Sequence, residues 1–302
     1  MTQYLPEVEA IAREAGALLM GYFASHVTIE YKGDVDLVTE ADRASEKMIV
    51  ERLRTRWPEH GIVGEEGARS GAGADYRWYV DPLDGTTNFA HGYPVFCISI
   101  ALVRNAPSTS ALRLPSGQAS PALVGELDAT DEQLEVGILY DPTRDEMFSA
   151  ERGHGATLNG KPIHVSKTAR LAESILGTGF PSHKRHKNPN IHFYHQITLR
   201  SHGVRRAGSA ALDLANVACG RYDGFWEFNL NPWDTAAGAL LVQEAGGRVT
   251  RFDGSPFRLD SREVLATNQL IHQELMTNFE EIFAGRGLEE LPSPVEYAKS
   301  RH

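Results

Sequence analysis

The change of hydrophobic pattern near residue 180 is the feature that most limits how this chain can fold. Before it, short apolar runs such as residues 95–103 and 134–140 follow one another like strands joined by hairpins. After it, helical and strand patterns alternate as far as residue 284. A chain of 302 residues can form one large domain or two packed halves. We predict an α+β fold whose two parts share one core.

The two patterns also define the domain organisation that we expect. We treat residues 1–302 as a single domain, with one subdomain at about residues 1–178 and another at about residues 179–302. Two amphipathic helices are predicted within the first 57 residues. The region 104–133 holds many Ser, Pro and Ala residues, and we expect it to be a long excursion from the fold.

Composition and charge exclude several classes of protein. Hydrophobic residues make up 41% of the chain and no apolar run approaches the ~20 residues of a membrane span, which excludes disordered and transmembrane proteins. The first residues lack the pattern of a signal peptide, and Cys97 and Cys219 support no disulfide framework, so we expect a cytoplasmic protein. A formal net charge of -10 opposes general nucleic-acid binding.

The densest group of chemically active residues is the run DPLDGTTNF at residues 81–89, directly after an apolar strand. Its carboxylates Asp81 and Asp84 lie three residues apart on a turn set by Pro82, so both can point into one small volume. Gly85 allows another backbone to approach closely, and the amides after it can face a phosphate if a helix begins there. The alternative is an Asx-type turn in which Asp84 only caps the following backbone.

Two further acidic motifs are candidates for the same site. Glu65 follows a short strand, where a solvated strand end is the usual alternative. Asp234 opens an apolar helix, and its alternative role as an N-cap would still leave one carboxylate oxygen free. If both residues meet Asp81 and Asp84, four negative charges within a few ångströms require cations to balance them. Convergence would therefore imply a metal site.

The type of ligand limits both the metal and the reaction. All four acidic residues offer hard oxygen ligands, with no His or Cys in their motifs, which favours Mg²⁺ or Mn²⁺ over Zn²⁺. Two such ions ~3.5 to 4 Å apart can hold a phosphate ester, activate a water molecule and neutralise the leaving alkoxide. Hydrolysis of a phosphomonoester is the reaction that this set of residues favours.

Several motifs together resemble those of the inositol monophosphatase family. They are, in chain order, DLVTEAD at residues 36–42, GEE at 64–66, DPLDGTTNF at 81–89, GSAALDLA at 208–215, and WDTAAG at 233–238 with EAGG at 244–247. The resemblance spans roughly residues 5–285. It implies a layered αβαβα sugar-phosphatase fold, dependence on two or three Mg²⁺ ions, inhibition by lithium, and a homodimer.

The resemblance assigns metal ligands residue by residue. It implies that Glu65, Asp81 and the Leu83 carbonyl bind a first metal ion, which would carry the attacking water. Asp81, Asp84 and Asp234 would bind a second ion. Glu65 would also share a weaker third ion.

The resemblance also implies roles in orienting water and binding substrate. Glu65 and the Thr86 hydroxyl would orient the attacking water, and Asp42 would hydrogen-bond Thr86. The alternative for Asp42 is the acidic position of a capping box, and the alternative for Glu227 is an outward-facing strand residue. The Gly85 and Thr86 amides would bind the phosphate of the substrate. The residues that would contact the remainder of the substrate are Gly208, Ser209, Ala210, Glu227 and Asp234.

The family includes phosphatases with different substrates. Asn88 and Phe89 at the end of the 81–89 run resemble the branch that hydrolyses myo-inositol monophosphate. We therefore predict that substrate or a similar small polyol phosphate. The alternatives are a 3′(2′),5′-bisphosphate nucleotidase, a histidinol-phosphatase or a fructose-1,6-bisphosphatase of the same superfamily. A regulatory role in binding RNA or protein on this scaffold is a further alternative.

The chain departs from the usual family pattern in two places. The region 104–133 is longer than the hairpin expected there, and its role is open. Residues 183–187, HKRHK, followed by His192 and His195, are unusually basic for the family. We favour a solvated helix face near the pocket, where cations attract an anionic substrate, over a transition-metal site on the two histidines.

Overall fold

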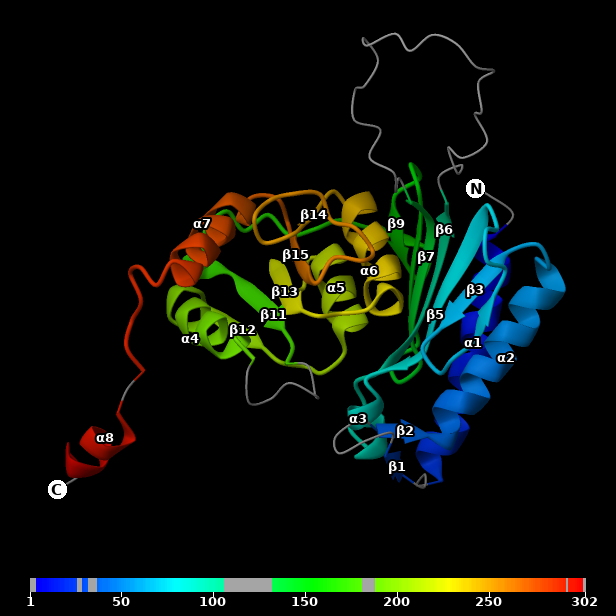
Figure 1. Cartoon of the computed structure of the whole chain (residues 1–302), viewed down its shortest axis with the longest axis horizontal. Coiled ribbons are helices and arrows are strands. Elements are labelled where there is room, and N and C mark those ends of the chain that lie inside the picture. The colour runs from blue at the N-terminus through cyan, green and yellow to red at the C-terminus, as the bar shows by residue number, and fades with distance from the viewer. Residues whose placement is uncertain are drawn as a thin grey trace, which may run out of the picture.

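Helices and sheets stack in alternating layers in the computed structural model (Figure 1). Helices α1 and α2 cover one face of an eight-stranded sheet, and α5 and α6 lie between this sheet and a five-stranded sheet. Helices α4 and α7 cover the other face of the second sheet. The predicted αβαβα layering is confirmed. The helix bounds are Leu5–Ala24 (α1), Glu40–Arg56 (α2), Asn190–Arg200 (α4), Ala210–Ala218 (α5), Pro232–Glu244 (α6) and His272–Phe283 (α7).

The larger sheet contains the strands that the sequence predicted as hairpins. Its order is β10-β9-β8-β7-β6-β5-β3-β4, and all neighbours are antiparallel except β3 and β5, which run parallel. Asn159 and Gly160, both with positive φ, form the two-residue turn between β9 and β10. The strands are Gly61–Gly64 (β3), Arg69–Ser70 (β4), Tyr76–Asp84 (β5), Cys97–Arg104 (β6), Gln133–Asp141 (β7), Glu146–Glu151 (β8), Ala156–Leu158 (β9) and Lys161–Ile163 (β10).

The smaller sheet has the order β12-β11-β13-β15-β14, with β11 parallel to both of its neighbours. Its first strand is Ile175–Thr178, which we predicted to belong to the first subdomain. The division between the sheets therefore falls before Ile175, because pairing between Leu176 and Gly224 draws this segment into the second sheet. The other strands are Gly203–Arg205 (β12), Gly224–Phe228 (β13), Arg248–Thr250 (β14) and Glu263–Thr267 (β15).

One core joins the two sheets, as the sequence predicted. Buried residues of the first sheet, such as Ala101 and Leu139, belong to the same apolar cluster as Leu240 on α6 and as Phe225 and Val264 on the second sheet. Strand alternation turns the other faces of the sheets toward the outer helices. The α5 and α6 layer is therefore held from both sides, which fixes the helix that carries Asp234 relative to the end of β5.

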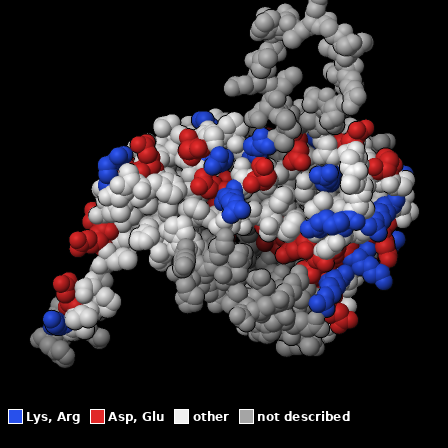
Figure 2. Space-filling model, viewed as in Figure 1, with Lys and Arg blue, Asp and Glu red and all other residues white. Residues whose placement is uncertain are grey.

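The structure describes residues 4–25, 29–31, 37–105, 132–180, 188–291 and 293–300. Most of the predicted excursion at 104–133 and the basic run at 183–187 lie outside these residues. No helix in the described ranges is long and apolar enough to cross a membrane. On the face shown in Figure 2, basic and acidic side chains are interspersed. The remaining elements are β1 (Ile29–Tyr31), β2 (Leu37–Thr39), α3 (Thr86–Ala90), a 3₁₀ turn (Leu171–Glu173) and α8 (Pro294–Ser300).

Candidate active site

The end of β5 carries two aspartates toward the helices between the sheets. Asp81 Oδ1 accepts a hydrogen bond from the Leu83 amide at 2.9 Å, so the residue that forms the Asx-type turn is Asp81 rather than Asp84. The register with β6 shifts between Asp81 and Asp84, as at a β-bulge. Ser45 Oγ on α2 donates to the Pro82 carbonyl at 3.1 Å and holds this turn. The bulge allows the Asp84 side chain to reach the helix layer between the two sheets.

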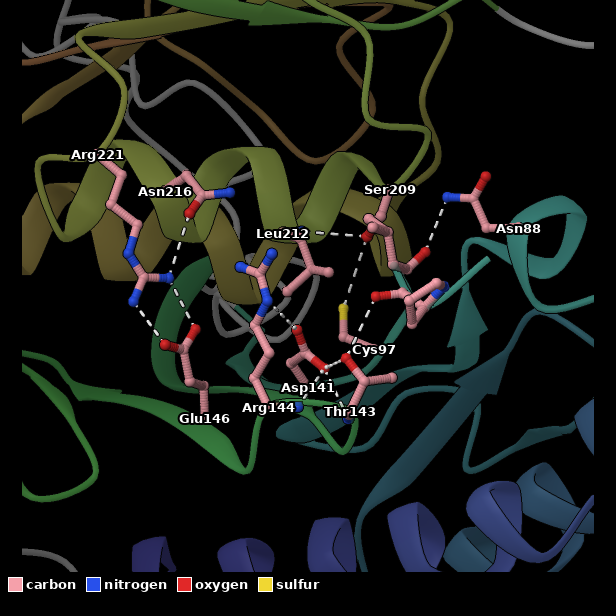
Figure 3. Close-up of polar contacts among 12 residues, drawn as sticks. Asn88, Cys97, Asp141, Thr143, Arg144, Glu146, Ser209, Leu212, Asn216 and Arg221 are labelled. Atoms are coloured by element: carbon pink, nitrogen blue, oxygen red, sulfur yellow. Dashed lines mark hydrogen bonds and ion pairs between the residues drawn. The ribbon is translucent and has the colours of Figure 1, made fainter. Parts of the chain in front are cut away.

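Asp84 connects β5 to the first turn of α5. Its Oδ2 accepts hydrogen bonds from Ser209 Oγ at 2.5 Å and from the Ala211 amide at 2.8 Å. Ser209 is the N-cap of α5 and accepts a bond from the Leu212 amide at 3.3 Å, and these two residues are seen in Figure 3. The alternative in which Asp84 caps only its own turn is therefore wrong. Asp84 and the predicted substrate residue Ser209 lie in direct contact.

Asn88 joins the same region from α3. Its Nδ2 donates to the Val95 carbonyl at 2.8 Å and to the Ala207 carbonyl at 2.9 Å, and lies 3.4 Å from the Gly208 carbonyl. Figure 3 shows Asn88 beside the segment that carries Ser209. Hydrogen bonds of Asn88 and Asp84 therefore connect the 81–89 run to the segment that contains the predicted substrate residues Gly208, Ser209 and Ala210.

Gly85 and Thr86 open a helix, as the phosphate hypothesis requires. Gly85 is the residue before α3 and has a φ of 98°, and a Cβ there would lie 2.8 Å from the Val95 carbonyl, so only glycine fits. The Thr86 hydroxyl lies 3.1 Å from Asp42 Oδ1 and 3.0 Å from the Leu83 carbonyl. Its single proton can be donated to one of these acceptors at a time, which leaves its lone pairs available to a water molecule.

Helix α2 presents buried acidic residues to this site. Asp42 is 1% exposed and reaches Thr86, so its predicted contact with that hydroxyl is present. Glu46, one helical turn later, accepts bonds from the Glu66 amide at 2.8 Å and the Ala68 amide at 3.0 Å. A Cβ on Gly64 would lie 2.1 Å from Glu46 Oε2, so this glycine makes room for the carboxylate. Glu46 therefore fixes the turn that carries Glu65.

The sequence did not identify Glu46, although a signal was present. Asp42 and Glu46 lie four residues apart, and both fall among the buried positions of α2, together with Ser45. Acidic residues on the buried face of a helix need partners, because an unpaired buried charge is costly. The four-residue spacing of Asp42 and Glu46 therefore indicated polar partners beneath this helix. It did not indicate which turn of the chain supplies those partners.

If Glu65 binds a metal ion, as the family resemblance implies, Glu46→Gln should lower the rate of phosphate release about 10-fold to 100-fold, as is typical for groups that hold metal ligands in place. The amide nitrogen of Gln cannot accept a backbone N–H, so one of the two buried amides would lose its partner. The measurement is kcat together with the Mg²⁺ concentration for half-maximal rate. Glu51→Gln on the exposed part of α2 is the matched control. A lower melting temperature with an unchanged kcat and Mg²⁺ requirement would limit Glu46 to a structural role.

Asp234 lies in the first turn of α6, but not at the position that we predicted. The helix begins at Pro232, whose ring suits a first turn, and Asn231 is the N-cap. Asp234 Oδ2 accepts a bond from the Asn231 amide at 2.7 Å and completes a capping box. The predicted N-cap role of Asp234 is therefore wrong by three positions. Burial, followed by the charges of the other acidic residues, raises the pKa of Asp234, and the bond from the Asn231 amide opposes that shift.

The acidic residues perturb one another strongly. Burial, followed by the charges of Glu65, Asp84 and Asp234, raises the pKa of Asp81 well above its usual value. Burial also raises the pKa of Asp84, and the hydrogen bond from Ser209 opposes that shift. Glu65 therefore lies close enough to Asp81 to oppose its ionisation. The four predicted ligands are thus close enough to repel one another when all are ionised.

These residues fit a hard divalent cation by their chemistry. Every side-chain donor is a carboxylate, and a cation would offset the charge repulsion that raises the pKa of Asp81. In the part of the chain that the structure describes, no three His, Cys, Asp or Glu side chains already have the arrangement of a closed metal site. A cation would therefore draw carboxylates together that are now held by Leu83, Ser209 and Asn231.

Glu227 is buried, so the outward-facing alternative is wrong. It is 7% exposed and lies on β13 between Trp226 and Phe228, which pack against the helices of the outer layer. Alternation therefore turns Glu227 toward α5 and α6. Burial and the charge of Asp84 raise the pKa of Glu227 to about 8, against the opposing effect of Arg206.

Asp213 on α5 is a second buried acid that the sequence did not single out. It is 1% exposed, and its Oδ1 has no hydrogen-bond partner among the described residues. Burial and the charge of Glu227 raise the pKa of Asp213 well above its usual value. Asp213 is therefore a second buried acid near Glu227, on the side of the site that the family resemblance assigned to Gly208, Ser209, Ala210, Glu227 and Asp234.

Comparison with known proteins places this arrangement in a family. The model of the inositol monophosphatase family matches residues 1–112 and 123–283. The chain is 44% identical over 266 residues to the inositol-1-monophosphatase of Synechocystis sp., covering 86% of this chain and 83% of that relative. It is 42% identical over 277 residues to the Nus factor SuhB of Pseudomonas aeruginosa, covering 89% of this chain and 93% of that relative.

A solved structure agrees with the sequence relatives. The inositol monophosphatase from Anabaena (Nostoc) sp. PCC 7120 matches with a TM-score of 0.76 and 39% identity, over 92% of this chain and 95% of that chain. The predicted family, layered fold and phosphatase class are confirmed. The chain belongs to the inositol monophosphatase family.

Proposed function

We propose that this phosphatase hydrolyses myo-inositol monophosphate, or a similar small polyol phosphate, with Mg²⁺ as its cofactor. The observation that carries the proposal is the gathering of Glu65, Asp84 and Asp234 around the buried Asp81, where burial and then these three charges raise the pKa of Asp81. Carboxyl groups this close are held ionised only by a cation, and an all-oxygen set of ligands favours Mg²⁺, with Mn²⁺ as the next choice.

The chain offers ligands for two or three Mg²⁺ ions. Glu65, Asp81 and the Leu83 carbonyl would hold one ion, Asp81, Asp84 and Asp234 would hold a second, and Glu65 would share a third. When bound, such ions neutralise phosphate charge, activate a water molecule and stabilise the leaving alkoxide. The capping box around Asp234 and the α5 contacts of Asp84 set the directions from which these carboxylates approach.

Thr86 and Glu65 would orient the attacking water. When the Thr86 hydroxyl donates its proton to Asp42, its oxygen can still accept a hydrogen bond, and the attacking water would donate that bond. Asp42 is nearly fully buried on α2, so it holds the hydroxyl in one rotamer. The pair therefore selects an orientation of the water in which a lone pair points at phosphorus, which is the requirement for in-line attack.

The two sides of the substrate would meet different groups. The Gly85 and Thr86 amides would bind the phosphate, and Gly208, Ser209, Ala210, Asp234 and Glu227 would contact the remainder of the ester. The raised pKa keeps Glu227 mostly protonated at neutral pH in the metal-free chain, so its carboxyl group can both donate and accept hydrogen bonds. That capacity suits the hydroxyl groups of a polyol.

We expect myo-inositol 1-phosphate to be hydrolysed with a higher kcat/KM than 3′-phosphoadenosine 5′-phosphate. Every phosphate monoester can bond to the protein groups that bind phosphate. Discrimination between substrates must therefore come from the alcohol side, where Asp213 and Glu227 are polar and buried. A site built to bond a hydroxyl rejects a ligand that leaves its polar groups unpaired. Initial rates of phosphate release on both substrates with Mg²⁺ test this preference.

Glu227→Gln should lower kcat/KM for inositol phosphate about tenfold, since one hydrogen bond to a hydroxyl would be lost or reversed. Glu263→Gln on the neighbouring strand β15 is the matched control and should leave kcat/KM unchanged. A preference for the nucleotide, or full inositol phosphate turnover in Glu227→Gln, would favour the nucleotidase branch instead.

Membership of the family also supports three properties that we propose for this chain. They are inhibition by lithium, assembly as a homodimer and a cytoplasmic location. Lithium would compete with a Mg²⁺ ion for the carboxylates of the site, so inhibition should weaken as Mg²⁺ is raised. Sedimentation of the purified chain tests the dimer.

A second candidate function is favoured by the name of one relative, Nus factor SuhB. In that role the chain would bind RNA or protein on the same scaffold. The net charge of -10 and the interspersed charges of Figure 2 oppose RNA binding as the sole role. Retention of RNA at physiological ionic strength that falls steeply with added salt would support this role.

A further inference from the structure

We propose that Arg69 on β4 is a positioning residue of the active site, which joins the turn that carries Glu65 to the start of α6, beside Asp234. In this role Arg69 sets how tightly the site holds its cation. The inference rests on the proposed function, in which Glu65 and Asp234 are metal ligands. Arg69 lies outside the motifs that carry the family resemblance.

The turn from Gly64 to Ala68 needs side chains to hold its shape. Its ends are joined by a bond from the Gly64 amide to the Ala68 carbonyl at 2.9 Å. Gly67 within it has a φ of 113°, and a Cβ there would meet open space. The turn leads into β4, a two-residue strand at the edge of the eight-stranded sheet. Ordering such a segment costs conformational entropy, so Glu65 has a fixed place only if other groups hold the turn.

Arg69 holds the carbonyl groups of this turn. Its Nη1 donates to the Ala68 carbonyl at 2.7 Å and also to the Gly64 carbonyl. Glu46 on α2 accepts bonds from two amides of the same turn. A cation therefore meets the carbonyls and an anion meets the amides, and hydrogen bonds with a charged partner are the stronger kind. Glu65 lies between the two carbonyls along the chain, so its backbone is held on both sides.

The same guanidinium group reaches the start of α6. The central carbon of Arg69 lies over the ring of Trp233, 5.5 Å from the ring centroid. The face of an indole attracts a cation more strongly than other aromatic rings do. Trp233 is in the first turn of α6 and directly precedes Asp234, and its carbonyl accepts a bond from Ser99 Oγ on β6 at 2.9 Å. Arg69 therefore contacts both segments that carry these two acidic residues.

This double contact has a consequence for cation binding. Glu65 and Asp234 lie close enough for the charge of one to act on the other, so repulsion tends to separate the turn from α6 when no cation is bound. Arg69 opposes that separation because it is attached to both segments. A cation then meets carboxylates that are already near their places, which lowers the cost of ordering them on binding.

The test is calorimetric titration of the metal-free full chain with Mn²⁺, which reports cation binding without catalysis. We expect Arg69→Met to weaken Mn²⁺ binding about tenfold, at the lower end of the effect of groups that position metal ligands. Arg69→Lys keeps a cation and a donor and should recover part of the loss. Arg104→Met, at an exposed arginine on β6 of the same sheet, is the matched control and should bind like the wild type.

A double-mutant cycle tests the connection through Trp233. Trp233→Leu should also weaken Mn²⁺ binding. Arg69→Met should then have a smaller effect in the Trp233→Leu background than in the wild type, because the contact between the two side chains is already absent. Fully additive effects would show that Arg69 acts on the turn alone and would overturn the connection to α6.

A merely structural role of Arg69 gives a different result. A lower melting temperature for Arg69→Met with unchanged Mn²⁺ affinity would overturn the proposal. Phosphate release with Mn²⁺, measured in parallel, separates this proposal from the proposed function. Mn²⁺ binding without release from any monoester would reject the proposed function, while the affinities of the variants would still decide the role of Arg69. No Mn²⁺ binding by the wild type would reject both.

Discussion

Replacing Asp84 with asparagine is expected to reduce phosphate release at least about 100-fold while the chain stays folded. Loss of a group that only supports a metal ligand costs about 10-fold to 100-fold, so loss of Asp84, which we propose as a ligand itself, should cost more. Asparagine keeps the shape of the side chain, and its one carbonyl oxygen can still accept the hydrogen bond from the Ala211 amide. The connection between β5 and α5 should therefore survive.

The same substitution should hold or raise the stability of the metal-free chain. The charge of Asp84 contributes to the raised pKa of Asp81 and of Asp234, so removing it relieves repulsion. Carboxyl groups whose pKa is raised by folding bind more protons in the folded state, so their ionisation destabilises the fold as pH rises through those values. The gain in melting temperature for Asp84→Asn should thus be larger at about pH 8 than at about pH 5.

The measurements for Asp84→Asn are phosphate release with saturating Mg²⁺ and thermal melting in a chelator. Asp260→Asn, at an exposed acid, is the matched control and should retain wild-type turnover. Normal turnover in Asp84→Asn would reject the metal-dependent mechanism. A large fall in melting temperature would show instead that the bond from Ser209 outweighs the repulsion.

Thr86→Ala is expected to lower kcat by about 10² to 10⁴, with a smaller change in KM. Groups that position the proton donor or acceptor in the transition state contribute rate factors of this size. The Thr86 hydroxyl contacts Asp42 and the Leu83 carbonyl rather than a group that binds the alcohol, so its loss should affect the reaction more than binding. Steady-state kinetics on inositol phosphate separate the two parameters.

Thr86→Ser is the control, because it keeps the hydroxyl and should retain most of the rate. Asp42→Asn should lower kcat as well, since an amide no longer accepts with the strength of a carboxylate. If Asp42→Asn lowers the melting temperature and leaves kcat unchanged, then Asp42 only stabilises the start of α2. In that case the orientation of the water must depend on Thr86 and Glu65 alone.

Local patterns predicted the parts of the fold that depend on neighbouring residues. The turn at Asn159 and Gly160 requires two positive φ values, which those residues adopt readily, so its place was predictable. The 81–89 run was likewise predictable as an acidic turn followed by a helix, because Gly85 permits the backbone that opens α3.

Contacts between distant segments were not predictable in the same way. Asp84 and Ser209 are 125 residues apart, and only the packing of α5 against β6 and β7 brings them together. Strands β11 and β15 are short and depend on pairing with β13. The N-cap of α6 was misplaced because Asp234 and Asn231 are both good capping residues, and Pro232 decides between them.

The acidic residues that the sequence missed share a physical reason. Glu46 lies on a helix rich in charged residues and Asp213 on a helix dominated by apolar ones, so neither residue stands out from its own helix in the sequence. Their importance depends on burial and on which backbone or charge they meet in space. The family resemblance named the residues that we propose contact substrate and metal, but not those that hold or surround them.

Return of Mg²⁺ to the metal-free chain tests the central claim most directly. The measurement is phosphate release from myo-inositol 1-phosphate after removal of metal by a chelator, followed by stepwise addition of Mg²⁺. We predict no release from the metal-free chain, a saturable rise in rate with Mg²⁺, and no rise in Asp84→Asn. Undiminished hydrolysis by the metal-free chain, or no hydrolysis at any Mg²⁺ concentration, would contradict the account.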